Sequence, residues 1–93
     1  MLTVFVEHSL TAAGREYFPN WVEEVRAAVA PFSGYRSLRR VADVERPERC
    51  LLFLEFAAVA ELRVWGGSEA HRRVLEKIRP YQVRKQQSRL LLS

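Results

Sequence analysis

The run Cys50–Phe56 constrains the fold of this chain more than any other segment, because it is apolar on both faces of a strand. Alternation places Leu51 and Phe53 on one face and four other apolar side chains on the opposite face. Such a strand is expected at the centre of a sheet. A chain of 93 residues builds only one core, and one layer of helices cannot bury both faces. The sheet of an identical subunit would cover the second face, which predicts a homodimer.

An amphipathic helix is expected before this strand, over residues 18–29, where apolar side chains recur at spacings of three and four. Thr11 is a suitable capping residue for the helical region. Pro19 either opens the main helix at its first turn or kinks a longer helix that begins near Ala12.

The other segments complete the order strand, helix, strand, strand, helix, strand. We expect a strand at residues 2–7, a weakly alternating edge strand at 35–44, a helix at 57–65, a further helix capped by Ser68, and a last strand at 81–92. This order predicts an α+β, ferredoxin-like split βαβ domain, in which helices cover one face of an antiparallel sheet.

Composition limits the partners and the location. The chain is 48% hydrophobic and 28% charged, which is typical of one globular domain over residues 1–93. Its net charge is +4, but acids are interleaved with the basic residues, so a mixed-charge surface is expected rather than a nucleic-acid interface. No apolar run approaches the ~18 residues that cross a bilayer, and the first residues lack the basic region of a signal peptide. A cytoplasmic protein without membrane contact is therefore expected.

Four segments together carry a family resemblance, namely residues 3–8, 31–35, 54–56 and 65–72. The most distinctive part is the spacing of Trp65, Ser68 and His71, preceded by Glu55 and Phe56. With these segments the chain resembles the antibiotic-biosynthesis monooxygenase family of dimeric α/β barrels. The resemblance implies a homodimer that oxidises a small aromatic molecule, a quinol or polyphenol, with dioxygen and without a metal or flavin cofactor.

One branch of this family degrades haem. Its members have an asparagine at the end of the first strand, a tryptophan in the second helical region and an iron-binding histidine on the next helix. Here His8 stands at the strand end, and His71 follows Trp65 more closely than the histidine of that branch does. Both departures argue against haem degradation.

His71 is the expected catalytic residue. It shares a helix face with Val74, Leu75 and Ile78, so its imidazole is expected to point inward. Near a helix N-terminus the dipole disfavours the charged ring, which leaves a neutral imidazole able to take a proton from a phenolic substrate. The alternative is a histidine that only packs in the core.

Five residues are candidates for substrate binding. Trp65 lies three residues after Leu62 on one helix face and could form the flat wall of an aromatic site. His8 could orient a substrate hydroxyl group, and Asn20 could hydrogen-bond to the substrate. The alternative for each candidate is a structural role alone. The full set is Trp65, His8, Asn20, Trp21 and Tyr35.

No metal site or cofactor is expected, because His8, His71 and Cys50 do not supply three or four spaced ligands and no phosphate-binding glycine loop is present. Two other functions stay open. A non-catalytic dimeric barrel could bind a small apolar ligand. An RNA-recognition module shares the element order, but its third strand carries a basic glycine and aromatic motif that Cys50–Phe56 lacks.

Overall fold

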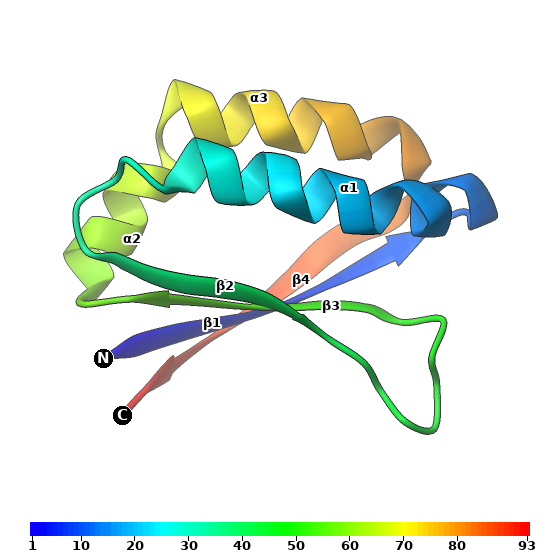
Figure 1. The fold of residues 1–93 in the computed structure, drawn as a ribbon, viewed down its shortest axis with the longest axis horizontal. Coiled ribbons are helices and arrows are strands. Elements are labelled where there is room, and N and C mark those ends of the chain that lie inside the picture. Colours follow the sequence, from blue (N-terminus) through cyan, green and yellow to red (C-terminus); the bar gives the residue numbers. More distant parts are fainter.

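The computed structural model describes all 93 residues as a four-stranded antiparallel sheet with helices on one face (Figure 1). The elements are β1 (Leu2–Leu10), α1 (Ala12–Val29), β2 (Tyr35–Val41), β3 (Cys50–Phe56), α2 (Val59–Gly66), α3 (Glu69–Ile78), the short 3₁₀ helix η1 (Arg79–Tyr81) and β4 (Gln82–Leu92). The strand order β2-β3-β1-β4 places β3 and β1 at the centre. This confirms the predicted split βαβ fold, with a central third strand and an edge second strand.

Helix α1 starts where the capping residue predicts. The Thr11 Oγ1 atom accepts a hydrogen bond from the backbone N–H of Gly14 at 3.1 Å. The helix continues through Pro19, so the longer of the two expected helices is the one that forms. The side chains on its buried face are Phe18, Trp21, Val22, Val25 and Val29.

The two faces of the sheet differ in what covers them. In the register, His8 pairs with Cys50 and Val4 with Leu54, and these positions lie under the helices. The opposite face, which we call the open face, has no helix over it (Figure 1). Phe5 and Phe53 of paired strands lie on it, as the alternation in β3 predicts.

Several element boundaries differ from the sequence expectations, and strand β1 continues to Leu10 rather than ending at residue 7. Strand β2 ends at Val41 rather than at residue 44, because the side chain of Asp43 accepts hydrogen bonds from the next backbone amides and forms a loop. Helix α2 begins at Val59, since Ala58 is still extended, with φ −150° and ψ 162°. Strand β4 begins at Gln82 rather than at residue 81, because the 3₁₀ turn that contains Pro80 ends at Tyr81.

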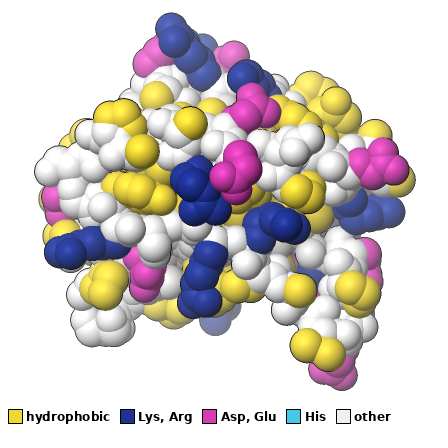
Figure 2. Space-filling view, viewed as in Figure 1, with side chains coloured by type: hydrophobic (Ala, Val, Ile, Leu, Met, Phe, Trp, Pro, Cys, Tyr) yellow, Lys and Arg dark blue, Asp and Glu magenta, His cyan; other side chains and the backbone are white.

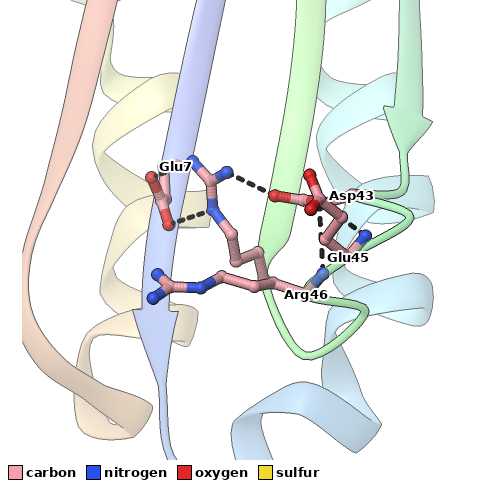
Figure 3. A network of polar contacts seen from close by, with 5 residues as sticks. Glu7, Asp43, Glu45 and Arg46 are labelled. Carbon is pink, nitrogen blue, oxygen red and sulfur yellow. Dashed lines mark hydrogen bonds and ion pairs between the residues drawn. The ribbon is translucent and has the colours of Figure 1, made fainter.

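A network of ion pairs ties the β2–β3 loop to the open face (Figure 3). The Arg49 guanidinium donates to both carboxylate oxygens of Glu7, at 2.9 and 2.7 Å, and to Asp43 Oδ2 at 2.6 Å. Hydrogen bonding from Arg49 is the main cause that lowers the pKa of both carboxyl groups. Asp43 also accepts from the backbone amides of Glu45 and Arg46, so the network fixes the loop conformation.

The charged surface is mixed, as the composition predicts. Figure 2 shows Lys and Arg side chains interspersed with Asp and Glu over the face that it presents. On α3, for example, Arg72 pairs with Glu69 and Glu76. None of the helices combines the length and the apolar character that crossing a membrane requires.

Candidate functional site

A cavity of about 370 Å³ lies between the helix-covered face of the sheet and the helices. This volume is at the small end of the range for ligand pockets, roughly 300 to 1,000 Å³. Eleven of its seventeen lining residues are hydrophobic, and four of the aromatic-ring residues singled out from the sequence line it together. Those four are His8, Trp21, Trp65 and His71.

His71 reaches the cavity from the first turn of α3. Ser68 sets the start of this helix, because its Oγ accepts a hydrogen bond from the His71 backbone N–H at 3.1 Å. The imidazole stands edge-to-face against the Trp65 indole, with ring centroids 5.2 Å apart and an interplanar angle of 78°. Burial lowers the pKa of His71, although the backbone of Gly66 acts in the opposite direction. The ring is therefore neutral at pH 7 and available as a proton acceptor.

His8 lines the cavity from β1 and is only 3% exposed. Its ring lies edge-on to Trp21, with centroids 4.9 Å apart. The Nδ1 atom is 3.4 Å from the Nε2 amide nitrogen of Gln82, a contact that favours the tautomer with its proton on the imidazole Nε2. Burial lowers the pKa of His8 to about 4, so this second imidazole is also neutral at pH 7.

The two tryptophans differ in what their indole N–H groups can do. Trp21 Nε1 donates to the backbone carbonyl of Val74 at 2.7 Å, which ties α1 to α3 and leaves no donor for a ligand. Trp65 packs edge-on against Phe32, at 5.0 Å between centroids, and its Nε1 has no acceptor within the protein. Because no buried side-chain nitrogen or oxygen lacks a partner, the Trp65 N–H must reach accessible space. No protein group accepts from this N–H, although Trp65 as a whole is only 2% exposed.

The other two candidates lie outside the cavity. Asn20 is exposed on α1, and Tyr35 packs edge-on against Phe56 with ring centroids 6.2 Å apart. The cavity lining therefore gives no support to the substrate-binding role expected for either residue.

Three polar lining residues were missed by the sequence reasoning: Arg63, Gln86 and Ser88. Gln86, Ser88 and Leu90 lie at every second position of β4, so period two already places their side chains on one face of that strand. Which face it is depends on the register, in which Ser88 pairs with Val6 and Leu90 with Val4. Arg63 lies two residues before Trp65, and no spacing along the chain indicates that it borders the cavity.

No group of three or more His, Cys, Asp or Glu side chains gathers where a metal ion could be held.

Comparison with known proteins gives likeness of structure without likeness of sequence. No family model and no curated protein matches the sequence. Among solved structures, a "putative antibiotic biosynthesis monooxygenase" from Bordetella bronchiseptica is similar over 99% of this chain and 95% of its own, with TM-score 0.87 and 13% identity. A protein of the same name from Nitrosomonas europaea is similar over 100% and 98%, with TM-score 0.83 and 10% identity.

The chain has the fold of these proteins. Rv0793 from Mycobacterium tuberculosis is similar as well, over 99% of this chain and 93% of its own, with TM-score 0.84 and 13% identity. The resemblance read from residues 65–72 and the other segments is thereby confirmed at the level of the fold. At these identities the likeness concerns architecture alone, so the chemistry has to be argued from the cavity.

Proposed function

We propose that this protein oxidises a phenolic substrate, a quinol or polyphenol, with dioxygen, using His71 as the base and Trp65 as the wall of the site. One observation carries the proposal: the neutral imidazole of His71 and the flat indole of Trp65 lie edge-to-face in one apolar cavity. A flat apolar wall suits an aromatic ring, and a neutral imidazole beside it suits a phenolic hydroxyl group.

The proposed reaction requires few protein groups. His71 takes the phenolic proton, and the electron-rich phenolate adds dioxygen at an activated ring carbon. The resulting peroxide anion takes the proton back from His71 and becomes a hydroperoxide. The O–O bond then breaks with loss of water, which leaves a quinone that holds one of the two oxygen atoms. All the electrons come from the substrate. The Trp65 N–H, which has no acceptor in the protein, is suited to hydrogen-bond the phenolate oxygen.

His8 and Trp21 supply a second polar position in the same cavity. The His8 imidazole is held against Trp21 and by the Gln82 amide, so its orientation is fixed before a ligand enters. A neutral ring fixed in this way is suited to hydrogen-bond a second hydroxyl group, as a quinol or polyphenol has. The test of the whole proposal is oxygen consumption with a panel of hydroquinones and polyphenols.

A homodimer formed through the open faces is part of the proposal. Phe5 and Phe53 present a half-buried aromatic pair there, with ring centroids 5.1 Å apart, and the Arg39 guanidinium lies 5.3 Å from the Phe53 centroid. An apolar sheet face of this kind is a typical site of association.

Aromatics on such a sheet also suit single-stranded RNA, but the open face carries both signs of charge, which suits a second copy of the chain. Arg49 is already neutralised by the carboxylates of Glu7 and Asp43. Glu55, which accepts from Ser37 Oγ at 2.5 Å, adds a further acid to the face beside Phe53. Arg39 and Arg89 lie opposite Phe53 and Phe5 in the register, so the bases and acids of this face can pair between two copies.

We expect Phe53→Ala to weaken the dimer roughly tenfold, as removal of a central interface aromatic commonly does. Light scattering over a concentration series measures this. Val64→Ala is the matched control, because Val64 is a 66% exposed apolar residue on α2, away from the open face. A wild type with the mass of a monomer at micromolar concentration would refute the dimer.

We also expect the purified protein to carry no stoichiometric metal or flavin, because its two histidines and one cysteine do not form a ligand set and it has no nucleotide-binding glycine loop. Elemental analysis and the visible spectrum measure this directly. A transition metal at one per chain would show that a ligand cluster had been missed.

A further inference from the structure

The charge of the cavity lining is concentrated in one residue. Of the seventeen residues around the cavity, only Arg63 is ionised at neutral pH, since His8 and His71 are neutral and the remaining polar members are uncharged. No carboxylate lines the cavity. A ligand held there therefore meets a positive charge that no acid within the site balances.

The guanidinium of Arg63 has no partner in the protein. Some arginines are engaged, such as Arg49 with Glu7 and Asp43, whereas Arg63, like Arg36 on the surface, is not; Arg63 differs from the other unpaired arginines in lining the cavity. Arg63 forms no such ion pair and no side-chain hydrogen bond, and the closest acid in sequence, Glu61, instead accepts from Ser33 Oγ at 3.3 Å. Five N–H donors at the cavity thus remain unused.

Arg63 lies at the entrance. It is exposed, as are Gly66, Ser88 and Leu90 of the same lining, so these residues mark where the cavity opens to solvent. A side chain added at Gly66 would meet no atom within 4 Å, which shows open space on α2 three residues beyond Arg63. An anionic group at this entrance would be within the reach of a long arginine side chain, while an attached ring extends inward to Trp65.

We propose that the cavity takes an aromatic carboxylate of one or two rings, whose carboxylate is bound by Arg63 at the entrance. This inference rests on the proposed function, which places the aromatic ring against Trp65. It adds that the substrate carries a negative charge, which distinguishes it from a neutral quinol. Guanidinium matches the planar carboxylate with two parallel hydrogen bonds. The small volume of about 370 Å³ favours one or two rings over a larger fused system.

The test compares two ligands that differ only in charge, 6-hydroxy-2-naphthoate and its carboxamide, by isothermal titration calorimetry. We expect the wild type to bind the carboxylate about tenfold more tightly, which is at the low end for a charged hydrogen bond because Arg63 is exposed. Arg63→Gln should abolish this preference and Arg63→Lys should keep part of it. Raising the salt concentration from about 50 to 500 mM should reduce the difference in affinity between the carboxylate and the carboxamide.

Arg36→Gln is the matched control, because Arg36 is an exposed arginine on β2 that lines none of the cavity. It should keep the full preference for the carboxylate. Equal binding of the two ligands to the wild type, or a preference that survives Arg63→Gln, overturns the inference, and oxygen uptake with neutral quinols would then still support the proposed function. If neither ligand binds, the inference falls, and oxygen uptake with neutral quinols decides the proposed function separately.

Discussion

His71→Ala is expected to lower oxygen uptake with a phenolic substrate about 100-fold, the loss typical of removing a general base. The reason is geometric: His71 is a neutral imidazole at the cavity wall against Trp65. Because His71 is only half-buried, its truncation should leave the melting temperature nearly unchanged. An oxygen electrode and a thermal melting curve for both proteins provide the two measurements.

The pH profile gives a readout that packing would not alter. Since burial places the pKa of His71 below 6.5, the acid limb of kcat/KM should lie below that pH and should be absent from the residual activity of His71→Ala. Arg73→Ala, on an exposed position of the same helix outside the cavity, is the matched control and should retain the wild-type rate.

The opposite pattern would assign His71 to packing. In that case His71→Ala would melt at a clearly lower temperature and would lose activity only in proportion to the folded fraction. A wild type that consumes no oxygen with any quinol would favour the other function kept open by the sequence, a dimeric barrel that binds a small ligand without catalysis.

The second large effect is expected in stability. The pKa of His8 is about 4 in the folded protein and 6.5 when unfolded, so below pH 6.5 the unfolded chain binds the extra proton first. The contribution of the buried, neutral His8 side chain to the free energy of unfolding is therefore complete above pH 6.5, and it is lost as the pH falls toward 4. The loss approaches ~1.4 kcal/mol per pH unit and reaches about 3 kcal/mol in total.

Urea unfolding of the wild type and of His8→Gln at pH 7, 6 and 5 measures this contribution. Glutamine keeps a polar side chain but does not titrate, so the difference in slope between the two proteins isolates His8 from His71, which shifts in the same direction. Hydrogen bonds from Arg49 lower the pKa of the Glu7 and Asp43 carboxyls in both proteins alike, so their contribution cancels in the difference. Equal slopes would mean that His8 is hydrated in the folded state.

The sequence by itself determined the order of the elements and the faces of the central strand. Period two in Cys50–Phe56 and period 3.6 in the first helix are local properties that survive any tertiary arrangement. Capping is equally local, which is why Thr11 and Ser68 were correctly assigned. The inward direction of His71 also followed from its spacing to Val74 and Ile78.

The tertiary structure alone decided which residues share the cavity. His8 and His71 are 63 positions apart in the sequence. They line the same cavity only because the register of β1 and the packing of α3 on α1 bring them together. Asn20 and Tyr35 were equally reasonable by residue type and lie outside it. Arg63 is informative because it is the one ionised residue of the cavity lining, and the fold, not spacing along the chain, decides which charge borders a cavity.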